Sequence, residues 1–467
     1  MLRLNELLEA TGGTLIRPAG PEKFPGLSTD SRTIGDGELF VALKGGNFDG
    51  NNFVEAACLK AGGAIVSRKP ASLPSGKTII VVSDTLKALQ SIARYIRGKM
   101  SIPVIGITGS NGKTTTKEMT AAVLGSKLNI LKSAGNLNNQ IGLPLNLCKL
   151  EERHAAAVLE MGASRPGDIE ELCEIAMPTH GVLTNVGISH LEGFSGSMEK
   201  LLDTKLALAR AAQTVIYNAD DSLLAPAIEH MAGKRLISFG IKNDARIRAD
   251  EGTIEFAPSG VCFGLASSLA AMEGKFRVQL PAQGAFNIYN ALAAVAAGAA
   301  LGINPAEAAK ALETFKGAPM RYEIKQTGGI TVLSDMYNAN PSSMEAAINE
   351  LARLRKVAAH KAGRAVAVLG DMLELGPVSE EEHRKLGGLL AALPVDEFIA
   401  VGQMMDLAYQ EFKKSGRGEN AHLCADSAEA GRLLKGKLIK GDIVLIKGSR
   451  GMKMEKVLEI LEAADAV

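Results

Sequence analysis

The chain has 467 residues, of which 46% are hydrophobic and 22% charged, a composition typical of a folded globular protein and not of a disordered or fibrous one. At about 150 residues per domain, this length predicts three domains. Lys and Arg total 52 and Asp and Glu total 51, so the net charge of +1 provides no global field that would attract nucleic acid or an anionic membrane.

The sequence lacks the patterns typical of disulfide-linked, secreted or membrane proteins. The five cysteines are scattered, without a CxxC pair, and their odd number argues against a closed disulfide framework. The opening residues, MLRLNELLEA, mix charges with apolar residues and lack the hydrophobic region of a signal peptide. The longest apolar run, Ala291 to Ile303, is shorter than the roughly 18 residues that a membrane helix needs. We therefore expect a soluble cytoplasmic monomer that binds neither membrane nor nucleic acid.

The first two predicted domains are both of the α/β class. Residues 1–84 combine an amphipathic opening helix with turns and short apolar strands. Thr85 to Arg97 has the periodicity of a helix, and after it apolar runs alternate with helical stretches, which predicts a mostly parallel sheet with helices on both faces. The expected strands of that sheet are Val104 to Thr108, Ala156 to Met161, Gly181 to Val186, Val215 to Asn218 and Leu236 to Phe239.

The pattern changes in the second half of the chain. Short alternating segments with Gly and Pro turns between Arg246 and Leu280 predict an accessory antiparallel sheet. The Ala-rich stretch Asn287 to Leu301 predicts a well-packed helix that closes a central domain of residues 85–317. Alternation of strands and helices then restarts, so residues 318–467 are expected to form a third, Rossmann-like α/β domain.

The most informative stretch is VIGITGSNGKTTTKEM (104–119), in which a glycine-bearing turn joins a buried strand to a helix start. Backbone N–H groups of such a turn and the helix N-terminus favour phosphate oxyanions. Lys113 is then placed to reach the β- and γ-phosphates of a nucleotide, and Thr114 to hold Mg²⁺. Ile107 stands where the longer phosphate-binding pattern has its first glycine, so this loop is shorter. A chance glycine turn is the alternative. The residues expected to contact the nucleotide here are Thr108, Gly109, Ser110, Asn111, Gly112, Lys113, Thr114 and Thr115.

Two more polar residues follow neighbouring predicted strands. Glu160 lies in AVLEMG and His190 in NVGISHLEG, at the strand ends where ligands collect in parallel α/β sheets. A carboxylate suits Mg²⁺, whereas an imidazole is a less usual ligand for so hard an ion. From the residues alone, a structural role is the commoner alternative for His190.

The short loop and its run of threonines resemble the nucleotide loop of the Mur ligase and folylpolyglutamate synthetase superfamily. This resemblance implies an enzyme that joins a carboxylate to an amine, with ATP and Mg²⁺ as cofactors. Mur ligases carry Mg²⁺ ligands at the motif positions of Glu160 and His190. Lys205 stands where several members carry a carbamoylated lysine that bridges two metals, and a solvated helix lysine is the alternative. The implied catalytic residues are Lys113, His190, Lys205 and Arg321.

The resemblance gives roles to residues farther along the chain. Asn287 and Asn290 lie in GAFNIYNALAA, the segment that contacts adenine in the family, although Phe286 stands in place of the usual His. Arg321 in APMRYE resembles an interdomain arginine that reaches the phosphates, and Asp335 in LSDMYNANPSSM resembles a ribose-contacting aspartate. A solvated arginine and a turn aspartate are the alternatives.

Motifs outside the phosphate loop indicate the branch of the family. STDSRTIGDGELFVALKGGNFDGNNF (28–53) resembles the UDP-sugar-binding domain of the Mur ligases that form the tripeptide and the pentapeptide, with turn and capping chemistry as the alternative for its first residues. GNLNNQIGLPL, DMYNANPSSM and LGDMLELG resemble the branch that adds D-alanyl-D-alanine to UDP-N-acetylmuramoyl-tripeptide. The residues expected to contact these two substrates are Ser31, Arg32, Asn52, Asn138, Asn139, Asn338, Lys447 and Ser449.

The implied reaction activates the tripeptide carboxylate as an acyl phosphate, which the amine of D-alanyl-D-alanine then attacks. Such a site needs residues from three domains, so we expect an open form that closes about hinges near residues 84 and 317. Two alternatives stay open. One is a neighbouring amide ligase that accepts a single amino acid, and the other is an ATP-binding regulatory or scaffold protein that kept the fold without catalysis.

Overall fold

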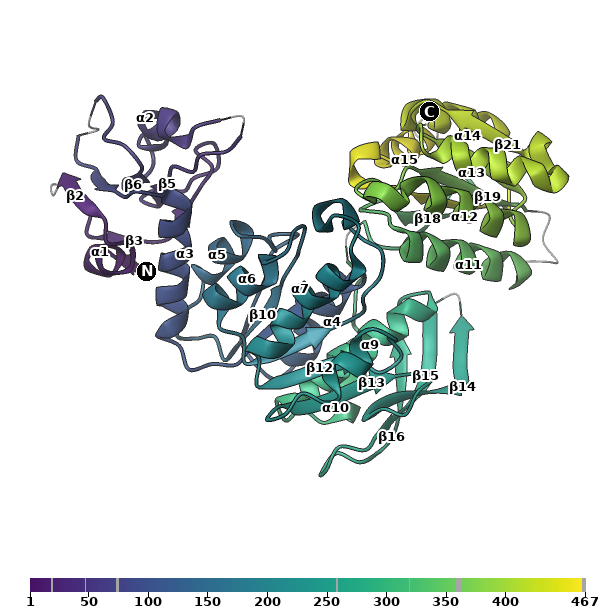
Figure 1. The fold of residues 1–467 in the computed structure, drawn as a ribbon, viewed down its shortest axis with the longest axis horizontal. Helices are drawn as coiled ribbons and strands as arrows, with labels where there is room; N and C mark the ends of the chain where they lie inside the picture. Colours follow the sequence, from purple (N-terminus) through teal and green to yellow (C-terminus); the bar gives the residue numbers. More distant parts are fainter. Residues whose placement is uncertain are drawn as a thin grey trace.

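The computed structural model describes residues 1–17, 20–46, 48–72, 75–257, 259–318, 320–357 and 363–463. Three main sheets follow one another along the chain, and each is covered by its own helices (Figure 1). The prediction of three successive α/β units is therefore confirmed.

The N-terminal sheet has five strands in the order β2-β7-β6-β5-β4, and only β2 runs antiparallel to its neighbour. Its strands are β2 (Thr14–Arg17), β4 (Leu27–Ser28), β5 (Leu39–Val41), β6 (Gly63–Val66) and β7 (Thr78–Val81). A short pair, β1 (Leu2–Arg3) and β3 (Lys23–Phe24), flanks α1 (Leu4–Thr11), and α2 (Val54–Ala57) follows β5.

The long helix α3 (Thr85–Gly98) joins the first unit to the second. It begins at Asp84, whose carboxylate accepts hydrogen bonds from the N–H groups of Leu86 and Lys87 and so caps the helix. Ala88, Leu89 and Ile92 of α3 belong to the N-terminal core, whereas Ala93 belongs to a core of the middle unit. The expected boundary at residue 84 therefore falls immediately before a helix that both units share.

The middle sheet has nine strands in the order β16-β15-β14-β13-β12-β11-β8-β10-β9. The central strand β8 pairs in parallel with β10 on one side and β11 on the other. The strands are β8 (Val104–Thr108), β9 (Ile130–Lys132), β10 (Ala156–Glu160), β11 (His180–Leu183), β12 (Thr214–Asn218), β13 (Arg235–Gly240), β14 (Ile247–Ala257), β15 (Gly260–Ser267) and β16 (Gly274–Leu280). The helices are α4 (Lys113–Gly125), α5 (Gly142–Leu147), α6 (Asp168–Ala176), α7 (Met198–Ala211), α8 (Leu224–Ile228), α9 (Ala285–Ala300) and α10 (Pro305–Leu312).

Two details of this sheet differ from expectation. The antiparallel strands β14, β15 and β16 continue the edge of the central sheet, because β14 pairs with β13. The strand predicted to reach Val186 ends at Leu183, because Thr184 and Asn185 turn their side chains to the phosphate loop. Hydrogen bonding to that loop thus replaces pairing within the sheet.

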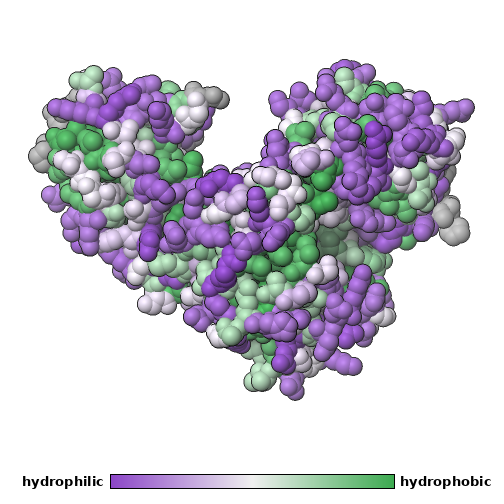
Figure 2. Space-filling view, viewed as in Figure 1, coloured by the Kyte–Doolittle hydropathy of each residue, from purple (hydrophilic) through white to green (hydrophobic). Residues whose placement is uncertain are grey.

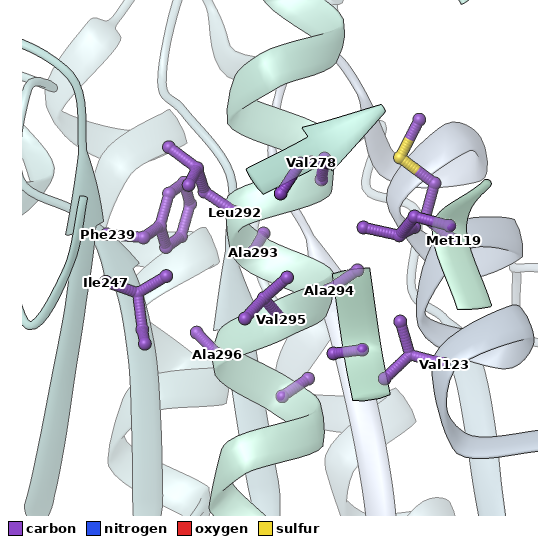
Figure 3. Close-up of a cluster of buried hydrophobic side chains, with 14 of the residues drawn as sticks. Met119, Val123, Phe239, Ile247, Val278, Leu292, Ala293, Ala294, Val295 and Ala296 are labelled. Carbon is purple, nitrogen blue, oxygen red and sulfur yellow. The ribbon is translucent and has the colours of Figure 1, made fainter. Parts of the chain in front are cut away.

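Alanines of α9 allow this helix to lie deep in the middle core. Figure 3 shows Leu292 to Ala296 between Phe239 and Ile247 on one side and Met119 and Val123 of α4 on the other. Small side chains permit close approach: a Cβ atom at Gly298 would lie 2.6 Å from Cγ1 of Val123. The helix that carries Asn287 and Asn290 is therefore held firmly against the helix that begins at Lys113.

The third sheet has six strands in the order β17-β18-β22-β19-β20-β21, of which only β17 runs antiparallel. Its strands are β17 (Glu323–Thr327), β18 (Ile330–Asp335), β19 (Ala365–Gly370), β20 (Glu397–Val401), β21 (Ala421–Cys424) and β22 (Ile443–Lys447). Its helices are α11 (Pro341–Val357), α12 (Ser379–Ala392), α13 (Met405–Phe412), α14 (Ser427–Lys437) and α15 (Glu455–Glu462). This arrangement confirms the predicted Rossmann-like unit.

The outer units sit at opposite ends of the middle one, and Figure 2 shows a wide notch open between them. All five cysteines are free, as their scatter predicted. Among the described residues, no helix has the length and apolar character needed to cross a membrane.

The close approach of α9 to α4 generates a prediction about stability. Gly298→Leu places a branched side chain against Val123, so we expect overpacking to destabilise the protein by about 1–3 kcal/mol or more. Calorimetric unfolding measures the change. Gly388→Leu, on a face of α12 where a Cβ meets nothing within 4 Å, is the matched control and should be neutral or slightly stabilising. Equal effects of the two substitutions would contradict tight α4–α9 packing.

Candidate active site

A cavity of about 1010 Å³ lies between the carboxyl ends of the middle strands and the start of the third unit. Its walls come from the phosphate loop, the segments that follow β10 and β11, the first turn of α9, the linker and the end of β18. The predicted site residues that line it are Ser110, Asn111, Gly112, Lys113, Thr115, Asn138, Asn139, Glu160, His190, Asn287, Asn290, Arg321, Asp335, Asn338 and Lys447. Residues chosen from separate motifs thus meet around one space.

The phosphate loop requires its glycines. Gly109 and Gly112 have φ values of +151° and +79°, a region in which other residues are strained. A Cβ atom at Gly109 would lie 1.9 Å from Oγ1 of Thr184, and one at Gly112 would lie 2.3 Å from Oδ1 of Asn290. The loop is therefore packed against β11 and α9 as closely as a bare backbone allows. Thr108 ends β8, and its hydroxyl donates to the carbonyl of Met161 at 2.9 Å.

Lys113 opens α4 and folds back over the loop. Its Nζ donates to the carbonyl oxygens of Gly109 and Ser110 at 2.8 and 3.0 Å. Burial lowers the pKa of Lys113 to about 8, Glu160 opposes this shift, and the nearby Arg321 adds to it. An incoming phosphate would offer Nζ a charged partner in place of two neutral carbonyls, so anion binding would raise the pKa of Lys113 and stabilise its cationic form.

Glu160 ends β10 and is 1% exposed. One carboxylate oxygen, Oε1, accepts a hydrogen bond from Nδ2 of Asn138 at 2.7 Å. The other, Oε2, is buried without a hydrogen-bond partner. A buried carboxylate oxygen left open beside a phosphate loop fits a divalent cation, because oxygen is the ligand that Mg²⁺ prefers.

His190 follows β11 with a left-handed backbone, φ +52°, and its Nδ1 contacts Oε2 of Glu374 from the third unit. Burial lowers the pKa of His190, Lys113 and Lys205 add to this shift, and Glu374 opposes it. The neutral imidazole is the form that binds metals. Across the described residues, no cluster of three or more His, Cys, Asp or Glu side chains gathers as a metal cage. A cation here would keep waters or substrate oxygens among its ligands, as Mg²⁺ usually does.

Lys205 lies on α7 and is 3% exposed, so it is not a solvated helix lysine. Within the described residues its ammonium has neither a hydrogen bond nor an ion pair. Burial lowers the pKa of Lys205 well below its usual value, and Lys113 adds to the shift. Its side chain does not line the cavity. A buried lysine without a counter-charge is costly. An anionic carbamate at this position would be attracted to Lys113, whereas the ammonium is repelled by it.

Arg321 reaches into the cavity from the linker. Its guanidinium stacks on the ring of Tyr337 at 3.7 Å, and Nη2 lies 3.5 Å from Oγ1 of Thr114. Its Nε is buried without a partner, so this cation keeps a free donor. Burial lowers the pKa of Arg321, and the charges of Asp335 and Glu160 oppose the shift. The arrangement is suited to an anion held between the loop and the third unit.

Asp335 and Lys447 end the paired strands β18 and β22 and form an ion pair through Oδ2 and Nζ. Lys447 also donates to the carbonyl oxygen of Asn338 at 3.0 Å, and its side chain is 1% exposed. Ser449 lies outside the cavity, where its hydroxyl accepts from the N–H of Leu373 at 2.8 Å. The structure therefore uses Lys447 and Ser449 to organise the third unit.

Asn287 and Asn290 form a buried chain of amides. Nδ2 of Asn287 donates to the carbonyl of Gln283 at 2.7 Å, and Nδ2 of Asn290 donates to Oδ1 of Asn287 at 3.0 Å. Phe286, which replaces the family's His, packs edge-on against Tyr322 with ring centroids 5.2 Å apart. An aromatic contact thus joins α9 to the linker where the family has an imidazole.

The N-terminal candidates do not reach this cavity. Arg32 is paired with Asp30 at 2.7 Å, and Oδ1 of Asn52 accepts from Nη2 of Arg68 at 2.8 Å. Neither they nor Ser31 line the cavity.

In the middle unit, Oδ1 of Asn139 accepts from the N–H groups of Ile141 and Gly142 at 3.1 and 2.9 Å, which fixes the turn into α5.

Sequence reasoning missed three polar residues that hold the phosphate loop. Asn185 accepts from the backbone N–H of Asn111, whereas Asn340 and Ser342, at the start of α11, bind the Asn111 side chain. All three lie inside motifs already singled out, NVGISHLEG and DMYNANPSSM. Their contacts join residues far apart in the chain, and no spacing rule predicts such pairs.

Family models match in three consecutive stretches. The Mur ligase middle domain matches residues 107–298, the glutamate ligase domain of Mur ligases matches 320–450, and the catalytic domain of the Mur ligase family matches 23–97.

Similar proteins cover the chain almost completely. A UDP-N-acetylmuramoyl-tripeptide–D-alanyl-D-alanine ligase of Bacillus subtilis is 36% identical over 98% of both chains, and the Escherichia coli enzyme of the same name is 32% identical over 93% of both. A MurF crystal structure from Acinetobacter baumannii is 34% identical and superposes with a TM-score of 0.87 over 99% of this chain and 98% of that one. The chain therefore belongs to the Mur ligase family.

Proposed function

We propose that the chain is a cytoplasmic, monomeric ATP-dependent ligase that joins D-alanyl-D-alanine to UDP-N-acetylmuramoyl-tripeptide in peptidoglycan synthesis. The observation that carries the reaction class is the cavity itself, which brings together Lys113 of the phosphate loop, Arg321 and the buried carboxylate of Glu160. The branch is supported by full-length relatives whose names state this reaction. A similar MurF ligase structure from Thermotoga maritima, 29% identical with a TM-score of 0.80, is a complex with ADP and supports ATP as the nucleotide.

The proposed first step forms an acyl phosphate. A carboxylate oxygen of the tripeptide attacks the γ-phosphorus of ATP, and the bond from that phosphorus to the β–γ bridging oxygen breaks to release ADP. Loop N–H groups and Lys113 would hold the phosphates, while Arg321, beside Thr114, would neutralise further negative charge. Asn287 and Asn290 would contact the base, and Asp335 the ribose. Positioning two anions in line is the main task of these residues.

The proposed second step forms the amide. The amine of D-alanyl-D-alanine attacks the acyl carbonyl carbon, and the tetrahedral intermediate expels inorganic phosphate as the nitrogen loses a proton. Asn138, Asn139 and Asn338 line the cavity near this position and would orient the peptide ends. Lys447 and Ser449 would act indirectly by holding the third unit's loops.

Residues around the loop fit Mg²⁺. Thr114, Glu160 and His190 would hold the ion, and Oε2 of Glu160 is open to it. Bound Mg²⁺ would neutralise negative charge on the phosphates. Lys205, if carbamoylated, would add a carboxylate-like group beside Lys113, and intact-mass measurement at neutral pH tests for the modification.

The proposed reaction is tested by phosphate release from ATP with UDP-N-acetylmuramoyl-tripeptide, with and without D-alanyl-D-alanine, while mass spectrometry follows the pentapeptide. We expect release that requires both substrates. Release with a single amino acid in place of the dipeptide would assign a neighbouring ligase, and no turnover with any pair would support the non-catalytic alternative.

Loss of the loop cation should abolish most of the activity. Lys113→Met removes the ammonium that holds the phosphates, so we expect kcat for phosphate release to fall by about 100- to 1000-fold. Lys99→Met removes the lysine that directly follows α3 and pairs with Glu6 at 2.5 Å, outside the cavity, and should retain wild-type turnover. Comparable activity of the two variants would remove Lys113 from the mechanism.

The unpartnered carboxylate oxygen of Glu160 predicts that substitution of this residue changes the Mg²⁺ requirement of turnover. Glu160→Gln keeps an acceptor for Asn138 but loses the negative charge, so the Mg²⁺ concentration for half-maximal turnover should rise at least about tenfold. Titration of turnover with Mg²⁺ at saturating ATP measures it. Glu307→Gln, which removes a carboxylate paired with Lys127 at 2.7 Å on the surface, is the control. An unchanged requirement in Glu160→Gln would place the metal elsewhere.

The wide notch predicts closure on ligand binding. We expect small-angle scattering to give a smaller radius of gyration with an ATP analogue plus UDP-N-acetylmuramoyl-tripeptide than without ligands. Identical dimensions in the two states would favour a rigid, pre-formed site.

A further inference from the structure

Asn111 stands at the tip of the phosphate loop, and its backbone is fully engaged within the middle unit. Its N–H donates to Oδ1 of Asn185 at 2.8 Å. Its carbonyl oxygen accepts from Oγ1 of Thr184 at 2.6 Å and from Nδ2 of Asn185 at 3.1 Å. The segment after β11 thus fixes the position of this residue, and only its side chain is left to contact anything else.

That side chain crosses to the third unit. Nδ2 of Asn111 donates to Oγ of Ser342 at 2.7 Å, and Oδ1 of Asn111 accepts from Nδ2 of Asn340 at 2.8 Å. Both partners lie at the start of α11. The two units also approach closely beside this contact, because a Cβ atom at Gly187 would lie 3.3 Å from Oγ of Ser342. Each polar atom of Asn111, in the backbone and in the side chain, therefore has a partner in the protein.

Helix capping fixes the direction of these hydrogen bonds. Oδ1 of Asn340 accepts from the N–H of Ser343 at 2.9 Å, and Oγ of Ser343 accepts from the N–H of Asn340 at 3.0 Å, so the pair caps α11. With its oxygen used by the cap, Asn340 presents its amide nitrogen to Asn111. Asn111 therefore accepts this hydrogen bond with Oδ1, and its Nδ2 is then directed to Ser342. The α11 cap thereby selects the orientation of the loop side chain.

We propose that Asn111 is a positioning residue whose side chain clamps the third unit onto the phosphate loop and does not bind nucleotide. The loop–domain clamp, made of Asn111, Asn340 and Ser342, links the loop that holds the phosphates to the strand and linker that carry Asp335 and Arg321. Its role in turnover rests on the proposed function, whereas its role in holding the units together does not.

Hydrogen exchange of the ligand-free full chain tests the clamp without reference to activity. Asn111→Ala should speed exchange in peptides covering the start of α11, and Ser342→Ala should speed exchange in peptides covering the loop. Ser343→Ala weakens the α11 cap but leaves both side chains that touch Asn111, and should speed exchange within α11 alone. If every variant showed faster exchange only in the element that carries the substitution, the clamp would be overturned.

A double-mutant cycle tests its role in turnover. Loss of the Asn111–Ser342 hydrogen bond should lower kcat about fivefold in Ser342→Ala, and Asn111→Ala, which also loses the bond to Asn340, should lower kcat at least as much. Because Asn111→Ala already removes the contact that Ser342→Ala removes, the double variant should fall no further than Asn111→Ala, and the two losses should not multiply. The dissociation constant of ADP, measured by calorimetry, should stay within about twofold of wild type in all three, since the clamp does not bind nucleotide.

Contrary outcomes separate the two proposals. Weaker ADP binding in Asn111→Ala but not in Ser342→Ala would make Asn111 a nucleotide ligand and overturn the clamp, as would multiplicative losses of kcat. Reciprocal changes in hydrogen exchange in a chain without ligase turnover would support the clamp and overturn the proposed function.

Discussion

Buried positive charge is the constraint on which the site depends. Lys113, Lys205 and Arg321 are held near one another, and burial lowers the pKa of each. The single buried carboxylate among them, Glu160, leaves an oxygen open. Such an arrangement is destabilising in a folded protein unless an anion and its counter-ion complete it. Under the proposed function, a triphosphate with its bound cation would supply the charges that Lys113 and Arg321, which line the cavity, and Glu160 lack.

The fold keeps these groups in place by packing and not by ion pairs. Gly109 and Gly112 leave no room for a side chain, so the loop rests directly on Thr184 and Asn290. Asn290 belongs to α9, whose alanines pack against α4 in the middle core (Figure 3). The helix that starts at the phosphates and the helix that carries the adenine-segment amides thus behave as one block. Contacts with the third unit combine the polar bonds of Asn111 with apolar packing such as that of Phe286 on Tyr322.

Periodic features were the easiest to predict from the sequence. The alternation of apolar runs gave the three α/β units, and motif spacing brought Lys113, Glu160 and His190 to one cavity, because the carboxyl ends of adjacent parallel strands share one edge. Burial of Lys205 and the pairing of Lys447 with Asp335 were not predictable, since each depends on contacts between distant segments. The same reason applies to the contacts of Asn340 and Ser342 with the phosphate loop.

The shared helix α3 limits how the molecule can close. Side chains of α3 belong to the cores of both the first and the middle unit. Rotation at residue 84 alone would therefore expose buried apolar side chains of one of these cores. The first and middle units should therefore move as one rigid body, and the third unit should move relative to both. Under the proposed function, a uridine bound on the N-terminal unit would then lie at a fixed span from the phosphate loop. The length of the nucleotide-sugar peptide, more than domain movement, would decide which peptide places its carboxylate at the reacting phosphate.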